Sequence, residues 1–127
     1  MKRIILALWL VSSSVCAGDL TANDLLTICT SKESGMQRLC GVYMLGAVQG
    51  IEIGQSLAIG PNKKVYAQLG KGVLCIPDDM STLQISRVFV DLASAMKSIY
   101  PSDLDAPAIG IVSAAFIRKF SCGASGK

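Results

Sequence analysis

Apolar residues recur at intervals of three and four along most of this chain, the spacing that gathers side chains on one face of an α-helix. The clearest example follows Ser81, which is expected to form a capping box with Gln84. Because Pro101 disfavours helical backbone at the residue before it, we expect this helix to end at Tyr100. Its apolar stripe consists of Ile85, Val88, Phe89, Leu92, Met96 and Ile99.

Two shorter helices are predicted towards the ends of the chain. Thr21, with Asp24 three residues later, indicates the N-cap and acidic first turn of one helix. Its apolar stripe is Leu25, Leu26 and Ile28. The other helix begins after Asp105, an expected N-cap with Pro107 in the first turn. Because residues 108–120 are apolar on nearly every side, we expect this helix to be buried centrally or shared with a second subunit.

The longest helix is predicted over residues 36–57. The residues expected on one face are Met36, Cys40, Tyr43, Ala47, Gly50, Gly54 and Leu57, and those on the wetter face are Gln49, Glu52 and Ser56. Gly46, Gly50 and Gly54 follow one another at intervals of four, so they line one side where a neighbouring helix can approach closely. We expect this close packing within the monomer, and a homodimer contact is the alternative.

The same stretch must be considered as a membrane span, because residues 39–60 are long enough and have the glycine spacing of membrane helix pairs. Glu52 alone would cost about 3 kcal/mol near the centre of a bilayer. Gln49 and Gln55 would add to that cost. We therefore predict a helix of a soluble protein, with no membrane insertion of the mature chain.

The first residues have the features of an export signal. Lys2 and Arg3 precede an apolar run over residues 4–10, and small residues follow up to Ala17. We expect residues 1–17 to be a signal peptide, cleaved after Ala17. A lipid anchor at Cys16 is the less favoured alternative, since Val15 precedes it.

Cleavage would leave residues 18–127 as one domain, with 123–127 as a frayed tail. Loss of Lys2 and Arg3 lowers the formal net charge from +3 to +1. No run of basic residues then remains to support nucleic-acid binding. The predicted location is the periplasm.

Four cysteines remain after cleavage, at Cys29, Cys40, Cys75 and Cys122, an even number that suits disulfides in an oxidising compartment. Four cysteines allow three pairings. The last two predicted helices are joined by a short turn and should run antiparallel, which brings Cys75 beside Cys122. Cys29 ends the first helix and Cys40 opens the next across a short turn. We predict these two pairs, within an all-α disulfide-stapled bundle of about four to five helices.

The composition argues against enzymatic chemistry. The chain contains no histidine to activate a cysteine nucleophile, and it has no Cys-x-x-Cys redox pair. The cysteine spacings match no compact zinc site. Asp78, Asp79, Asp103 and Asp105 lie where they would favour helix starts, so we predict no enzyme, no metal and no cofactor.

The order of four short motifs carries a family resemblance. They are Leu-Leu-x-x-Cys (25–29), Cys-Gly-x-Tyr-x-x-Gly (40–46), Cys-Ile-Pro (75–77) and Phe-x-Cys (120–122). With the export signal, they resemble the Tai family of type VI secretion amidase immunity proteins, which includes the resistance-associated immunity proteins. The resemblance implies a mainly helical periplasmic protein, often a homodimer, that binds a secreted peptidoglycan amidase and occludes its active-site cleft.

An inhibitor of this kind needs a rigid surface and no catalytic residue. The expected presenting loops are residues 60–74 and residues 100–107, with a slight preference for the first because of its length and its mixture of cations with an aromatic residue. A solvated connection is the alternative for that loop. The expected contact residues are Lys63, Lys64, Tyr66 and Lys71 in the first loop and Asp103 and Asp105 in the second.

Other functions remain open at this point, because a shared scaffold does not fix function. One is a periplasmic adaptor or small-ligand-binding helical domain without a toxin partner. Another is an envelope-stress or assembly factor, whose deletion would impair growth without any toxin.

Overall fold

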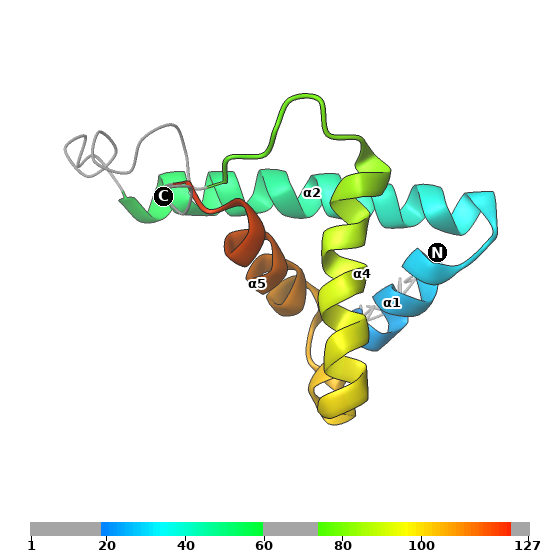
Figure 1. The fold of residues 1–127 in the computed structure, drawn as a ribbon. Coiled ribbons are helices and arrows are strands. Elements are labelled where there is room, and N and C mark those ends of the chain that lie inside the picture. Colours follow the sequence, from blue (N-terminus) through cyan, green and yellow to red (C-terminus); the bar gives the residue numbers. More distant parts are fainter. Residues whose placement is uncertain (1–18, 60–73, 123–127) are drawn as a thin grey trace, which may run out of the picture.

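The computed structural model describes residues 19–59 and 74–122, and its regular structure there is all-helical (Figure 1). The helices are α1 (Ala22–Thr30), α2 (Ser34–Ile59), α4 (Thr82–Ile99), the 3-10 helix η1 (Pro101–Asp105) and α5 (Ala108–Phe120). The predicted small helical bundle is therefore confirmed. The predicted signal peptide (1–17) and tail (123–127) lie outside the described residues.

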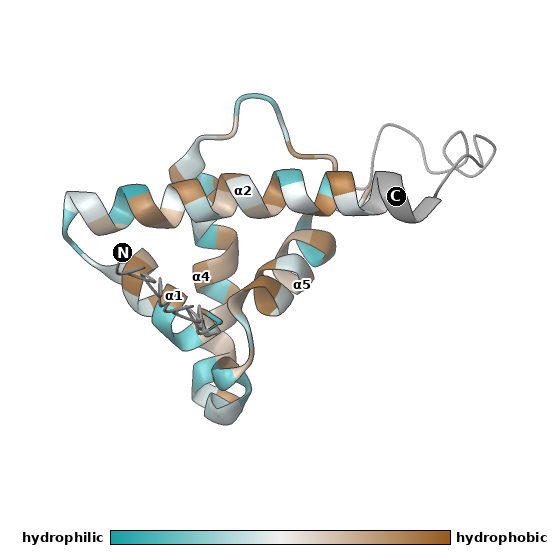
Figure 2. Ribbon diagram, turned by 180° about the vertical axis from the view of Figure 1, so that it is seen from behind, coloured by the Kyte–Doolittle hydropathy of each residue, from teal (hydrophilic) through white to brown (hydrophobic). Residues whose placement is uncertain are grey.

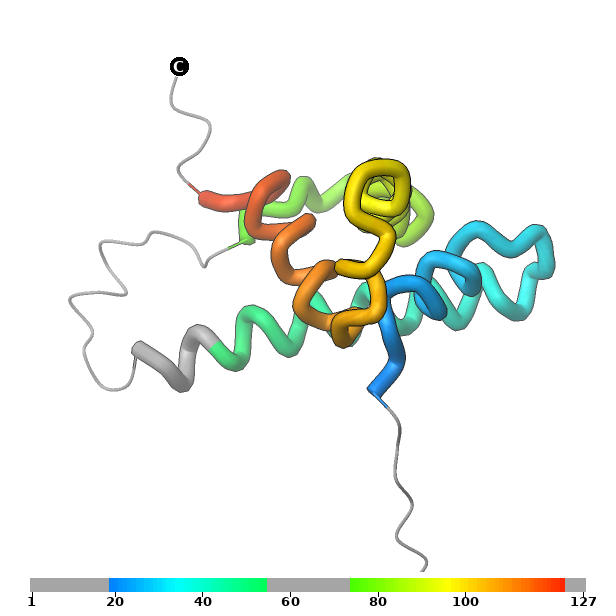
Figure 3. The backbone as a smooth tube through the Cα atoms, turned by 90° about the horizontal axis from the view of Figure 1, so that it is seen from below, coloured from blue at the N-terminus to red at the C-terminus, as the bar shows by residue number. Residues whose placement is uncertain are grey.

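The long helix α2 spans the width of the molecule, and the other helices lie on one side of it (Figures 1 and 3). Helices α1, α4 and α5 each pack against α2. They also pack against one another, and α1 and α4 both contact η1. The end of α4 and η1 therefore form the part of the molecule that points away from α2 (Figure 1).

The hydrophobic core lies where α1, α4 and α5 meet beneath α2. Phe89 of α4, Phe116 of α5 and Leu25 of α1 are among its largest fully buried side chains. Met44 of α2 and Leu104 of η1 complete it from two sides. Each helix of the described fold thus contributes at least one side chain to a single core, which is how a chain of this size buries enough apolar surface to fold.

The capping boxes predicted for α1 and α4 are both present. In α1 the Asp24 N–H donates to Thr21 Oγ1 at 3.1 Å, and Asp24 accepts from the Thr21 N–H at 3.4 Å. In α4 the Ser81 N–H donates to Gln84 Oε1 at 2.8 Å. These bonds satisfy backbone donors that a helix start leaves without intrahelical partners, so the two helix starts are fixed locally.

The start of α5 differs from the prediction. Asp105 ends η1 and is not an N-cap; α5 begins at Ala108, after Pro107, which makes no side-chain cap. The reason is tertiary: the Ala108 N–H donates to the backbone oxygen of Leu20 at 2.7 Å. The segment before α1 thus takes over the role that a capping side chain would have.

The two disulfides form the pairs that the helix order predicted. Cys29 and Cys40 join the end of α1 to α2, with Cα atoms 5.1 Å apart. Cys75 and Cys122 join the segment before α4 to the end of α5, with Cα atoms 5.0 Å apart. Beside the second bridge, the Cys75 N–H donates to the Phe120 oxygen at 2.7 Å. Both bridges therefore connect segments that already lie together.

The predicted burial of two helical stripes needs correction. In α2 the buried side chains are Cys40, Met44 and Ala47, whereas Gly50 and Gly54 are exposed. In α4 the expected core residue Ile99 is 66% exposed, because the last turn of α4 extends beyond its neighbours (Figure 1). Helix α5 is likewise buried on one side only, since Ile109 and Ile117 are exposed.

Within 19–59 and 74–122, no helix combines the length and the hydropathy that crossing a bilayer requires.

Candidate partner-binding surfaces

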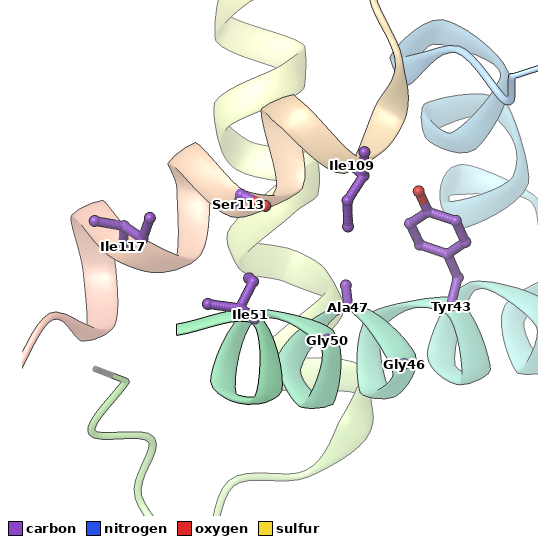
Figure 4. A pocket seen from close by; sticks show the side chains of 9 residues that line it. Tyr43, Gly46, Ala47, Gly50, Ile51, Ile109, Ser113 and Ile117 are labelled. Carbon is purple, nitrogen blue, oxygen red and sulfur yellow. The ribbon is translucent and has the colours of Figure 1, made fainter. Parts of the chain in front are cut away.

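A groove of about 700 Å³ runs between α2 and α5 (Figure 4). The α5 side chains face those of α2 across it in Figure 4. Among the described residues that line it, Tyr43 and Ser113 supply hydroxyl groups and the others are apolar or glycine. We call this surface the α2–α5 groove; it is lined by Tyr43, Gly46, Ala47, Gly50, Ile51, Gly54, Ile109, Ser113 and Ile117.

The glycines of the groove are open to solvent and are not packed against a neighbouring helix. A Cβ atom placed at Gly46, Gly50 or Gly54 would meet no side chain or neighbouring helix of the described fold within 4 Å. The prediction that these three glycines permit close packing within the monomer is therefore wrong. The close approach occurs instead at Gly41, where a Cβ would lie 2.8 Å from Thr82 Cγ2 of α4.

Tyr43 stands at one end of the groove, beside Ile109 (Figure 4). Its side chain is partly buried, and this burial raises the pKa of the Tyr43 hydroxyl above its ordinary value, because the ionised form loses hydration. At neutral pH the hydroxyl is protonated and can donate or accept a hydrogen bond. The groove therefore offers mainly apolar contact with a few orienting polar atoms.

A second apolar surface continues from the groove along the outer side of α2. We call it the α2 stripe; it consists of Leu39, Val42, Gly46 and Ile53, which recur at intervals of three, four and seven residues and so share one face. Its three large side chains are 52–67% exposed. Apolar residues recur along α2 and α5 in Figure 2. Contiguous exposed apolar surface of this kind marks interaction sites more often than an isolated exposed side chain does.

A third surface is the end of the molecule farthest from α2, which we call the tip: Ile99, Tyr100 and η1 (Pro101–Asp105). Ile99 and Tyr100 are 66% and 61% exposed. The predicted site residues Asp103 and Asp105 both lie in η1, which follows Tyr100 directly, and both are exposed.

The other predicted contact residues are not placed. Lys63, Lys64, Tyr66 and Lys71 all lie outside the described residues, so their role stays a prediction. The four predicted cysteines form disulfides. Nowhere in the described part of the chain do three histidine, cysteine or acidic side chains gather as a metal site would require.

Comparison with protein families gives one match that covers most of the chain. Residues 21–122 match the family described as Rap1a immunity proteins. The chain belongs to the Rap1a immunity protein family. Searches of curated proteins and of solved structures gave no match. The matched range contains every described helix and both disulfides, so membership in an immunity family applies to the whole described fold. Membership in this family supports an immunity protein against a secreted effector.

Three features of these surfaces were not predicted. Ile99 and Tyr100 were assigned to the core stripe and to the helix end, and the exposure of Ile109 was not foreseen. The 3-10 helix lies where the sequence pattern predicts a plain turn, although Pro101 at its first position is a local signal for a helical start. The sequence pattern does not predict which apolar residues are exposed, because an apolar stripe has the same spacing whether or not a neighbouring helix covers it.

Proposed function

We propose that this protein is a periplasmic immunity protein that binds a type VI secreted peptidoglycan amidase and blocks its active-site cleft. The observation that carries the proposal is the family match over residues 21–122. The amidase target comes from the motif resemblance of the sequence. The periplasmic location is supported by the export signal predicted for residues 1–17 and by two disulfides, which persist in oxidising compartments.

The architecture suits inhibition by binding. An inhibitor must present a preformed surface, because ordering a flexible surface on association lowers affinity. Here two disulfides, two capping boxes and a shared core hold the exposed surfaces of the described fold in place. The exposed apolar residues on α2, α5 and the tip then supply contact area.

The proposal is tested by protection in living cells. A candidate effector, sought among the genes that neighbour this one, is directed to the periplasm of a bacterial host, with or without this protein. We expect lysis in its absence and growth in its presence. A matched control lacks residues 2–17 and stays in the cytoplasm; it should not protect. Failure of the full chain to protect, with effector and chain both present, would contradict the proposal and favour an adaptor or ligand-binding role.

The amidase assignment needs a separate test. Purified effector is incubated with peptidoglycan, and release of free amino groups from cleaved peptide bonds is measured with increasing amounts of this protein. We expect inhibition that saturates at one binding site per effector. An effector that this protein neutralises but that cleaves glycosidic bonds or lipids would contradict the amidase assignment and leave the immunity function intact.

We further propose that the protein is a homodimer that pairs through the α2 stripe and the α2–α5 groove. The stripe is self-complementary in an antiparallel pair with its two-fold axis at Gly46. Leu39 and Ile53 lie seven residues on either side of Gly46, so each would face the other in the partner. Val42 and Gly50 lie four residues on either side, so the Val42 side chain would face the open glycine. Isologous pairing of this kind is the commonest form of homo-oligomer.

Light scattering during size-exclusion chromatography tests the dimer. We expect the mass of a dimer for the wild type and of a monomer for Val42→Glu, which places charge at the centre of the stripe. The control is Ile99→Glu, an equally exposed apolar position on the tip, which should remain a dimer. A monomeric wild type, or a Val42→Glu variant that stays dimeric, would contradict pairing through this face.

A further inference from the structure

A separate groove lies between α4 and α5, which pack against each other (Figure 1). It has a volume of about 400 Å³, and its walls come from residues 88–95 of α4 and residues 115–119 of α5. We call it the α4–α5 groove. It shares no lining residue with the α2–α5 groove, the α2 stripe or the tip. Its residues therefore have no part in the dimer contact proposed above.

The floor of the α4–α5 groove is apolar and has small side chains on both helices. Val88 and Leu92 are partly buried, and Ala95 continues the same face of α4. Ala115 lies opposite them on α5. A volume of this size falls within the range of small-molecule sites in proteins. The groove therefore has room for a small ligand group that is partly apolar.

The two walls of the groove carry opposite charges. Asp91 lies on α4, and Arg118 and Lys119 lie on α5, and all three are exposed. None of these three side chains forms an ion pair or a hydrogen bond with another described residue. The helix dipole accounts for cations in the last turn of α5, but it does not account for a carboxylate on the other helix. The groove thus has an anionic wall and a cationic wall that do not neutralise each other directly.

This distribution of charge selects the chemistry of a ligand. A ligand with only a carboxylate would lie near Asp91, and one with only an ammonium group would lie near two cations. Like charges repel at close range, so neither ligand suits both walls. A ligand that has both groups a few atoms apart can place its carboxylate at Arg118 and Lys119 and its ammonium group at Asp91. Charge-assisted hydrogen bonds of both kinds are stronger than neutral ones.

We infer that the α4–α5 groove binds the zwitterionic end of a short peptide, one that carries a free ammonium group and a free carboxylate. The peptides of peptidoglycan supply such an end where their diamino acid is not cross-linked. The choice of peptidoglycan as the source rests on the proposed function, whereas the ligand chemistry rests on the groove. The site would hold the protein on the polymer that the proposed effector cleaves, and it requires no contact with the effector.

A titration followed by nuclear magnetic resonance tests the inference on the purified protein without any effector. The probe is the tripeptide N-acetyl-L-alanyl-γ-D-glutamyl-meso-diaminopimelate, whose diaminopimelate end is zwitterionic. We expect saturable shifts of amide resonances in residues 88–95 and 115–119. The same tripeptide with its ammonium group acetylated should bind about three- to tenfold more weakly, because it loses one charged contact. Rising ionic strength should weaken binding of the unmodified probe.

Charge variants test the two walls separately. Asp91→Asn and Arg118→Gln should each weaken binding of the tripeptide about three- to tenfold. The matched controls are Asp79→Asn and Arg38→Gln, which remove an exposed carboxylate and an exposed cation outside the groove. Both controls should bind as the wild type does.

A variant that fills the groove tests its shape without changing any charge. Ala95→Leu places a larger side chain on the floor and should abolish the saturable shifts. The control is Ala114→Leu, the same substitution at an exposed position of α5 that does not line the groove, and it should bind normally. Unchanged thermal unfolding of both variants would show that a loss of binding arises from the filled groove.

Three results would overturn the inference. They are the absence of saturable shifts in the wild type, shifts centred outside residues 88–95 and 115–119, and equal binding by the wild type, Asp91→Asn and Arg118→Gln. Each of these results leaves the immunity proposal intact, since no effector is present. Conversely, a failure to protect cells from the effector would refute the proposed function and leave a measured peptide site in place.

Discussion

The outer side of α2 and the region where α1, α4 and α5 converge contain similar apolar residues, which are exposed in the first region and buried in the second. In the converging region Phe89, Phe116 and Leu104 are fully buried. Along α2 the side chains of Val42 and Ile53 are more than half exposed, and a Cβ atom added at the glycines between them would touch no neighbouring helix of the described fold. The fold therefore buries its apolar side chains on one side of α2 and leaves apolar side chains exposed on the other, and exposed apolar surface of this kind is expected of an interface.

The largest expected effect separates the two regions by stability. Phe89→Ala should lower the free energy of unfolding by about 3–5 kcal/mol, because it removes a buried ring and leaves a cavity. Val42→Ala should change it by about 0.5 kcal/mol or less, since the side chain is mostly exposed. Denaturant unfolding followed by circular dichroism, at low protein concentration, measures both. Similar losses in the two variants would mean that the α2 stripe is already buried in the single chain.

Removal of a disulfide should have the next largest effect on stability, because each bridge fixes one region to the rest of the fold. Replacing Cys75 and Cys122 together by serine should cost about 2–4 kcal/mol, and replacing Cys29 and Cys40 by alanine should cost less. The Cys75–Cys122 bridge closes the longer loop, with a sequence separation of 47 against 11 for Cys29–Cys40. Its loss therefore frees more of the unfolded chain. Thermal and denaturant unfolding of both double variants give the order. The reverse order would show that the Cys29–Cys40 bridge restrains more than its own short loop.

A pair of glycine variants on the same helix sharpens the contrast further. Gly41→Ala should destabilise the protein by about 1–2 kcal/mol, because the new methyl group overlaps Thr82 at the contact between α2 and α4. Gly50→Ala should stabilise the isolated chain by up to about 1 kcal/mol, since alanine favours helix and the space is open.

The same pair distinguishes an open face from an interface. If α2 pairs with a second copy, Gly50→Ala should weaken the dimer in sedimentation equilibrium while it raises the stability of the monomer. A destabilised Gly50→Ala monomer would show that the glycine face is packed within the chain after all.

The smallest expected effect is on the free energy of unfolding at alkaline pH. Because burial raises the pKa of Tyr43, the folded protein keeps a proton that the unfolded chain releases near its ordinary value of about 10. The free energy of unfolding should therefore be unaffected at neutral pH and fall as the pH rises above about 10. Tyr43→Phe should reduce that fall. Unfolding midpoints between pH 7 and about 11 measure it, and equal slopes in wild type and variant would contradict the raised pKa.

Much of the fold follows from short-range sequence signals. The two residues of each capping box, Thr21 with Asp24 and Ser81 with Gln84, lie within four residues of each other. Both boxes can therefore be predicted from the sequence, and the structure contains both. The proline after Tyr100 likewise ends α4 where expected. The pairing of Cys75 with Cys122 followed from the helix order, because two helices joined by a short connection must run antiparallel.

The candidate surfaces could be predicted less well from the sequence, because they depend on which neighbouring elements cover each helix. The sequence predicts Asp103 and Asp105 of the tip as contact residues, but its apolar pattern places Ile99 in a core stripe and Tyr100 at a helix end, whereas both are exposed. A periodic pattern shows which side chains share a face of α4, and it does not show that the last turn extends past α1 and α5.

The approximate positions of α1, α2, α4 and α5, the starts of α1 and α4, and an even set of four cysteines for two bridges could all be predicted from the sequence. These depend on side chains within a few residues of one another or on chain order. Tertiary packing, in contrast, determines that α2 buries Cys40, Met44 and Ala47 and leaves Gly46, Gly50 and Gly54 exposed, and that the Leu20 carbonyl accepts from the start of α5 in place of an Asp105 cap. Those outcomes depend on surfaces brought together from distant parts of the chain, where burial of the largest apolar area outweighs local preference.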